Sequence, residues 1–317
     1  MNMFKYFTTI TFLLTGLTWL SSCKKDVPGN VDENASFNAS LVSDRIQAGN
    51  AAEFVLTENP DIISFYSGEI GHEYRYRDRT VLEGGSLKVK FETRLQNVAM
   101  DSSLEVMISN DFSGVYDSAS VVNAHWKNMN SFFTYPLPSD PLSVFYPCGP
   151  MQGDFADFTD SVTNGEPFYY AFKYTNKTPS SIIWSINKMS MYNVFTAGNI
   201  PSATIIDSNQ ITSGNFASVQ INDQGVTRWS TSSTYLKCTN SSAAPVGAEY
   251  WYISRPLNPS AVAPDVPVVI KNITQNPMTS YRYTYNQPGT YKATFVARYA
   301  RLNFQKTIVR EFTVTVE

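Results

Sequence analysis

Short runs of alternating apolar and polar residues dominate this chain, and few stretches repeat apolar residues with helical spacing. Runs such as Leu87–Leu95 and Thr290–Ala300 send successive side chains to opposite faces, as half-buried strands do. Gly, Pro, Asn, Asp and Ser bound the runs as turn residues. The sequence therefore predicts an all-β protein. Other strands are expected at Phe37–Ile46, Ala51–Leu56, Ile62–Tyr66, Leu104–Ser109, Phe168–Tyr174, Ile182–Tyr192, Ala203–Ile206, Tyr250–Ser254, Val266–Ile270, Ser280–Tyr285 and Ile308–Val316.

The C-terminal segment Ser280–Ala297 contains Tyr-x-Tyr-x-x-Pro-Gly-Thr-Tyr. It resembles the closing half of an immunoglobulin-like domain of the polycystic-kidney-disease type, and Phe37–Glu69 resembles the opening half. The C-terminal piece has too few strands to close a sandwich by itself. We therefore expect one immunoglobulin-like sandwich built from residues 36–80 plus 258–317, with a jelly-roll-like β-sandwich inserted over residues 81–257. The alternative is three consecutive units.

The first 22 residues have the form of a targeting segment. Lys5 is their one charge, and Tyr6–Leu20 is an apolar run too short to span a membrane as a helix. Leu20-Ser21-Ser22-Cys23 then resembles a bacterial lipobox, in which the cysteine is acylated and becomes the new N-terminus. We expect removal of residues 1–22, a lipid on Cys23 and a flexible tether over residues 23–35. The alternative is a secreted protein with an incidental cysteine.

Charge and cysteine content bear on partners and compartment. With a formal net charge of −3, the chain lacks the excess of basic residues with which proteins bind nucleic acid. The run Cys23-Lys24-Lys25-Asp26 resembles the start of mature Bacteroidetes lipoproteins, and the resemblance implies an outer-membrane protein directed to the cell surface. Cys148 and Cys238 remain after acylation of Cys23, and outside the cytoplasm such a pair can form a disulfide. The alternative is two buried thiols.

The most distinctive stretch is Phe65–Arg79. From His72 its residues alternate, so we expect a strand with Tyr74 and Tyr76 on one face and Arg75 on the other. Such a strand either forms the rim of a domain or presents a ligand-binding surface, because tyrosine stacks and arginine donates forked hydrogen bonds.

The pattern Phe-Tyr-Ser-Gly-Glu-x-Gly-x-x-Tyr-x-Tyr-x-x-Arg resembles a Bacteroidetes lipoprotein family catalogued as domain of unknown function 5017. Further matching positions lie at Asp111–Gly114, Ala171–Tyr174 and Trp184. Relatives of this kind are often encoded beside outer-membrane glycan-uptake systems, so the resemblance implies glycan capture and possible contact with transporter proteins. It brings no catalytic residues to carry over.

The sequence contains few residues or motifs that indicate catalysis or metal binding. The chain has two histidines, His72 and His125, and lacks the His-Glu-x-x-His, Gly-x-Ser-x-Gly and phosphate-loop motifs. Asp154, Asp157 and Asp160 form an acidic cluster that could hold a structural Ca²⁺ through carboxylate oxygens. The alternative is a set of solvated loop acids.

Aromatic residues supply the candidate ligand contacts, because sugar rings stack on indole and phenol rings. Trp184 lies among isoleucines and is expected in the core. Trp126 and Trp229 lie in polar, turn-like surroundings and are the candidate exposed platforms. Packing in a core or at a rim is the alternative for both.

Three functions follow from these observations. The first is a non-catalytic, lipid-anchored surface protein that binds glycan. The second is a structural or adhesive lipoprotein that contacts protein partners. The third is a glycan-active hydrolase with paired carboxylates, whose separation only a structure can give.

Overall fold

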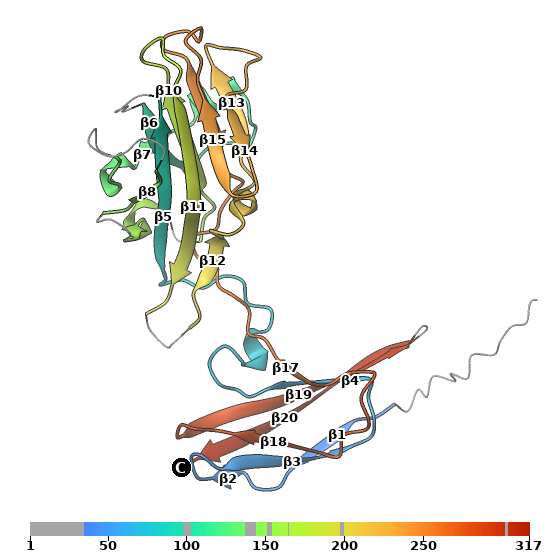
Figure 1. Ribbon diagram of the computed structural model, residues 1–317. Helices are drawn as coiled ribbons and strands as arrows, with labels where there is room; N and C mark the ends of the chain where they lie inside the picture. The colour runs from blue at the N-terminus through green and yellow to red at the C-terminus, as the bar shows by residue number, and fades with distance from the viewer. Residues whose placement is uncertain are drawn as a thin grey trace, which may run out of the picture.

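The structure, a computed structural model, describes residues 35–97, 103–136, 144–150, 154–163, 165–196, 200–301 and 304–317. These residues form two β-sandwiches joined by a neck that the chain passes through twice, over residues 67–85 and 254–267 (Figure 1). The all-β prediction is confirmed. Within the described ranges, α1 (Ser118–Asn123) is the one α-helix, and short 3-10 helices lie at η1 (Tyr74–Tyr76), η2 (Asn130–Phe132), η3 (Thr159–Ser161) and η4 (Ile211–Gly214).

The first sandwich draws its strands from two distant parts of the sequence. They are β1 (Asn38–Leu41), β2 (Arg45–Ile46), β3 (Ala51–Thr57), β4 (Ile62–Tyr66), β17 (Val268–Lys271), β18 (Ser280–Thr284), β19 (Gly289–Arg301) and β20 (Phe304–Val316). The smaller sheet has the order β1-β3-β18, and the larger has the order β17-β4-β19-β20-β2. β2 pairs with β20 in parallel. The chain therefore leaves this immunoglobulin-like sandwich after β4 and returns to it with β17.

Aromatic packing fills the first core. The rings of Phe54, Phe65 and Phe295 come from both sheets and pack with centroids 4.9–5.8 Å apart. At the start of β19, the hydroxyl of Tyr291 donates to the carbonyl of Gln287 at 2.9 Å. This is the tyrosine corner of immunoglobulin-like folds, and it fixes the turn that carries the chain from one sheet to the other.

The second sandwich is formed by the strands between β4 and β17. They are β5 (Ser86–Gln96), β6 (Leu104–Ser109), β7 (Lys127–Asn128), β8 (Tyr146–Cys148), β9 (Ala156–Asp157), β10 (Tyr169–Thr175), β11 (Ile183–Val194), β12 (Ala203–Ile206), β13 (Ala217–Ile221), β14 (Trp229–Thr231), β15 (Tyr235–Thr239) and β16 (Glu249–Ile253). One sheet has the order β13-β16-β10-β6-β7. The other has the order β14-β15-β11-β5-β8, with β12 beside β11 and β9 beside β5.

Alternation of side chains explains the second core. Along β5, each second residue is buried and its neighbours are partly exposed. Phe91 from this strand meets Phe172 of β10 across the core, with ring centroids 5.3 Å apart. Trp184 on β11 is buried in the same cluster, as expected. The strands predicted from alternation thus place their apolar faces between the two sheets.

The Ser67-Gly68-Glu69 motif follows β4 at the start of the neck. Hydrogen bonds attach this motif to the first sandwich. The hydroxyl of Tyr285 donates to the carbonyl of Ser67 at 2.7 Å, and the hydroxyl of Tyr283 bonds to the Glu69 carboxylate. Gly68 has a left-handed φ of +83°, and a Cβ there would lie 2.5 Å from the backbone nitrogen of Lys292. Both the conformation and the close approach require glycine.

Gly68→Ala is expected to destabilise the first sandwich by about 3 kcal/mol or more, because a left-handed alanine costs roughly 1–2 kcal/mol before any clash with rigid backbone is added. Gly49→Ala is the matched control. Its φ is +85°, but no atom lies within 4 Å of the added Cβ, so only the conformational cost applies.

The measurement is urea unfolding followed by circular dichroism and by tryptophan fluorescence. All tryptophans after residue 22 lie between residues 126 and 251, so fluorescence follows the second sandwich alone. Equal losses of stability in the two variants would contradict the close-packing argument.

Candidate functional site

One sheet of the second sandwich is apolar on both faces. In β16, Tyr250 and Tyr252 face the main core, while Trp251 and Ile253 face outward. Met107 of β6, Ala171 of β10 and Val219 of β13 share that outer face. Together with Phe112 and Val121 they form a buried group that we call the outer cluster. An apolar sheet face must be covered, and the segment containing α1 covers this one.

Trp126 helps to hold α1 over the outer cluster. Its ring lies 4.9 Å from Trp251 and 5.5 Å from Phe112, and its indole N–H donates to the carbonyl of Val121 at 3.0 Å. The side chain is half-buried. Trp126 therefore packs beneath the segment that contains α1. The expectation of an exposed Trp126 ring, based on its polar neighbours, is wrong.

The loop before Trp126 is fixed by a carboxylate. Asp111 accepts bonds from the backbone N–H of His125 at 2.9 Å and from the Ser109 hydroxyl at 2.8 Å, and it pairs with the imidazole Nδ1 of His125 at 2.6 Å. The bond with His125 holds the pKa of Asp111 below its usual value. Because Ser109 donates to Asp111 and not to the imidazole, these side chains lack the order of a hydrolytic triad.

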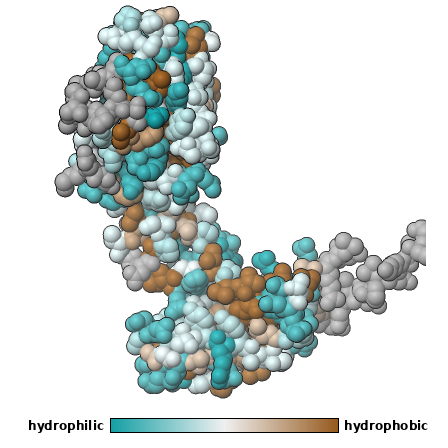
Figure 2. Space-filling view, in the orientation of Figure 1, coloured by the Kyte–Doolittle hydropathy of each residue, from teal (hydrophilic) through white to brown (hydrophobic). Residues whose placement is uncertain are grey.

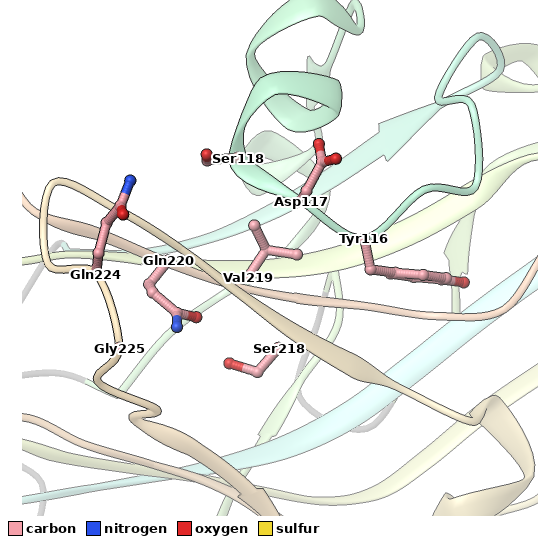
Figure 3. A pocket seen from close by; sticks show the side chains of 8 residues that line it. All are labelled: Tyr116, Asp117, Ser118, Ser218, Val219, Gln220, Gln224 and Gly225. Atoms are coloured by element: carbon pink, nitrogen blue, oxygen red, sulfur yellow. The ribbon is translucent and has the colours of Figure 1, made fainter.

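A groove runs between α1 and β13, the edge strand of its sheet. One part encloses about 250 Å³ and is lined by Tyr116, Asp117, Ser118, Ser218, Val219, Gln220, Gln224 and Gly225 (Figure 3). The adjoining part encloses about 380 Å³ and is lined by Ser118, Ala119, Val122, Asn123, Ile221, Asn222 and Gln224. Ser118 and Gln224 border both parts, so the groove is continuous and elongated.

Polar side chains of the groove are available to a ligand. Within the described part of the chain, the side chains of Ser118 and Gln224 make no hydrogen bond to other protein groups, whereas neighbouring loop residues do. Ser218 and Gln220 alternate with Val219 along β13, so their side chains point away from α1 (Figure 3). Amides and hydroxyls both donate and accept, and an edge strand adds backbone N–H and C=O groups. The groove can thus hydrogen-bond an extended, hydroxyl-rich molecule.

Tyr116 and Asp117 form the end of the groove nearest the start of α1. The Tyr116 hydroxyl donates to the carbonyl of Ser254 at 2.9 Å, and burial raises the pKa of this phenol, so it stays neutral. Asp117 caps α1 by accepting the backbone N–H of Ser120 at 2.7 Å. This bond lowers the pKa of Asp117, so the carboxylate is ionised at neutral pH.

Trp229, the second expected platform, is buried and belongs to the core. It stacks on Tyr252 with centroids 5.3 Å apart, and its indole N–H donates to the carbonyl of Tyr250 at 2.8 Å. The expectation of an exposed ring is wrong, because β14 folds Trp229 inward while Arg228 and Asp223 pair beside it at 3.2 Å.

The expected strand from His72 to Arg79 is also wrong. Tyr74–Tyr76 forms the 3-10 helix η1, and its rings stack with arginines. The guanidinium of Arg77 lies 4.2 Å from the centre of the Tyr74 ring, and those of Arg75 and Arg79 lie 4.5 and 4.2 Å from that of Tyr76. Arg75 therefore contacts Tyr76, and Tyr74 contacts Arg77 and the ring of Tyr66. None of the three candidate residues lines the groove.

The three candidate calcium ligands do not converge. Asp157 pairs with Lys88 at 2.5 Å and accepts the backbone N–H of Thr159 at 3.0 Å. Asp154 borders a separate hollow of about 280 Å³ that includes Lys90 and Lys188. Asp160 is exposed on η3. No group of three or more His, Cys, Asp or Glu side chains suited to a metal occurs among the described residues, so the calcium prediction is corrected.

The possible bond between Cys148 and Cys238 does not form, and the alternative of two buried thiols is the one found. Both thiols are buried, on β8 and β15 of one sheet. β11 and β5 lie between those strands. Three strand spacings amount to roughly 14 Å, whereas a disulfide needs Cα atoms within about 7 Å. Burial raises the pKa of Cys148 to about 12, so this thiol stays protonated.

The predicted signal segment and Cys23 lie outside the described residues. Within the described ranges, no helix has the length and apolar character needed to cross a membrane.

The sequence reasoning missed the groove. Its two sides lie about a hundred residues apart, and Gln220 and Ser218 carry no motif. The one local signal was Asp117 before Ser118, an N-cap that predicts the start of a helix.

Comparison with known proteins gives one match. A family model described as a domain of unknown function (DUF5017) matches residues 22–213. No curated protein and no solved structure matches this chain.

A chain beginning at Lys24 and purified without reductant is expected to show two thiols after unfolding in guanidinium chloride. In the native protein, neither should react quickly with a thiol reagent, because burial disfavours the reactive thiolate of Cys148 and shields both sulfurs. Ellman's reagent counts the thiols. Recovery of no thiol after unfolding would contradict the separation of Cys148 from Cys238.

Proposed function

We propose that this chain, which belongs to the family of the domain of unknown function DUF5017, is a lipid-anchored, non-catalytic protein that binds glycan in the groove between α1 and β13. The observation that carries the proposal is the set of groove amides and hydroxyls without protein partners. A glycan chain offers many hydroxyls along its length and fits an elongated, shallow site better than an enclosed pocket.

The groove combines the two kinds of contact that sugars need. Ser118 and Gln224 supply side-chain hydrogen bonds, and Tyr116, Ala119 and Val122 supply apolar surface. The outer cluster beneath α1 stiffens this surface, so the polar groups keep their positions without the ligand. Pre-positioned groups lose less conformational entropy on binding.

The affinity for one short oligosaccharide should be low. Each net hydrogen bond contributes about 1 kcal/mol, so a few such bonds give a dissociation constant on the order of 1 mM. Many anchored copies on one surface would hold a long polymer far more tightly through multivalency.

The double variant Ser118→Ala, Gln224→Ala is expected to weaken polysaccharide binding about 30-fold, because two hydrogen bonds worth roughly 2 kcal/mol together are lost. Affinity electrophoresis of the chain from Lys24 measures this in gels that contain soluble starch, dextran, xyloglucan, galactomannan or arabinan. Gln305→Ala is the matched control, since Gln305 is an exposed residue of β20 in the other sandwich.

Two results would contradict glycan binding in the groove. One is equal retardation of the double variant and the parent on a polymer that the parent binds. The other is no retardation on any polymer, which would favour protein contact through the exposed valines Val266, Val268 and Val269 at the edge strand β17. Figure 2 shows a hydrophobic patch in that part of the first sandwich.

The lipid anchor rests on the lipobox ending at Cys23. The full chain should fractionate with membranes, and Cys23→Ala should abolish acylation and retain the uncleaved signal segment. Metabolic labelling with a fatty acid followed by gel separation measures the lipid. Incorporation into Cys23→Ala equal to that of the parent would contradict an anchor at this residue.

A further inference from the structure

Asp117 gives the groove its charge. Of the described side chains that line the two parts of the groove, this carboxylate alone carries a formal charge at neutral pH. We propose that the groove binds neutral glycans and rejects acidic ones, with Asp117 as the residue that sets this specificity. The inference rests on the proposed function and adds the substrate class to it.

Local bonding keeps the Asp117 carboxylate in place. One oxygen accepts the backbone N–H of Ser120 at 2.7 Å, and the residue is exposed at the side of the groove formed by α1 (Figure 3). This bond makes the rotamer that removes the carboxylate from the groove unfavourable. A glycan carboxylate or sulfate in the groove would therefore lie near a fixed negative charge.

Two basic residues near the groove, Arg228 and Lys173, do not compensate for this charge, because acidic partners already occupy them. Arg228, beyond the turn at Gly225, pairs with Asp223 at 3.2 Å. Lys173, on the outer face of the sheet, lies between Glu105 at 3.3 Å and Glu249 at 2.8 Å. Recognition of acidic polymers uses arginines and lysines that are available to the ligand, and neither of these is.

The size of the effect follows from the distance and the solvent. Two like charges several ångströms apart at a protein surface repel enough to change an affinity by about tenfold. The repulsion weakens when salt shortens the screening length. A carboxylate that excludes unwanted ligands in this way adds specificity without adding affinity.

The test uses matched pairs of polymers and the chain from Lys24. Each neutral polysaccharide (soluble starch, dextran, xyloglucan, galactomannan and arabinan) is compared with a lightly carboxymethylated form of itself. The measured quantity is the ratio of the two dissociation constants for one protein. For the parent chain we expect the carboxymethylated form to bind about tenfold more weakly at low salt, and the ratio to fall toward one in about 0.5 M NaCl.

Two variants should change the ratio in opposite directions. Asp117→Asn keeps a capping side chain and removes the charge, so the ratio should fall to about one. Gln224→Glu adds a carboxylate to the groove, so the ratio should rise by a further factor of about ten. Glu311→Gln removes a charge from β20 of the other sandwich and controls for net charge.

The outcomes separate this inference from the proposed function. If the parent binds neutral polymers and Asp117→Asn leaves the ratio unchanged, the specificity inference fails and glycan binding stands. A preference of the parent for the carboxymethylated polymers also overturns the inference. If the parent binds none of the polymers, neutral or carboxymethylated, the proposed function fails and the inference fails with it.

Discussion

The carboxylate of Asp265 is the interaction on which the join between the two sandwiches depends. It lies almost fully buried between the two neck segments, pairs with Arg79 at 2.9 Å and accepts the backbone N–H of Glu73 at 2.8 Å. Arg79 in turn stacks on Tyr76. Loss of one member of such a buried pair costs about 3–5 kcal/mol, because the remaining charge stays out of water. The tyrosine and arginine residues of the distinctive stretch Phe65–Arg79 thus build the neck, which accounts for their pattern without any ligand.

Most of the fold could be predicted from side-chain alternation, because the long strands have one face in a core. β5 and β19 match the runs Leu87–Leu95 and Thr290–Ala300 closely. The short strands β13, β14 and β15 were missed, since each has five residues or fewer and only tertiary contacts bury Trp229. The alternation from His72 misled for a different reason: stacking between near neighbours in the sequence, such as Arg77 on Tyr74, stabilises a compact turn as well as an extended strand.

The site was less predictable, because its parts are brought together by sheet order. Nothing in the sequence places Asp117 and Gln224 in one groove, or separates Cys148 from Cys238 by two strands of one sheet. The aspartates near residue 157 were close in sequence, yet one of them pairs with Lys88. The sequence indicated aromatic residues as candidate ligand contacts. Which of those groups are buried and which remain available for binding depends on the fold.

Two features of the edge strand β17 hinder its pairing with strands of other molecules. A bulge interrupts its register with β4, and Lys271 turns inward, where its ammonium group donates to the carbonyl of Pro60 at 2.8 Å. Bulges and inward charges are devices that keep exposed edges from joining other sheets. The valines beside them can therefore remain exposed on a strand that resists aggregation.

The double passage of the chain through the neck has a mechanical consequence. β4 leaves the first sandwich beside the point where β17 enters it, and the two strands are paired through Phe65 and Val268. A force that pulls the second sandwich away from the first acts on β4 and β17 at the same end of the sheet. Such a force does not slide one strand past the other. The tension divides between two covalent connections, and the ladder between β4 and β17 carries little shear.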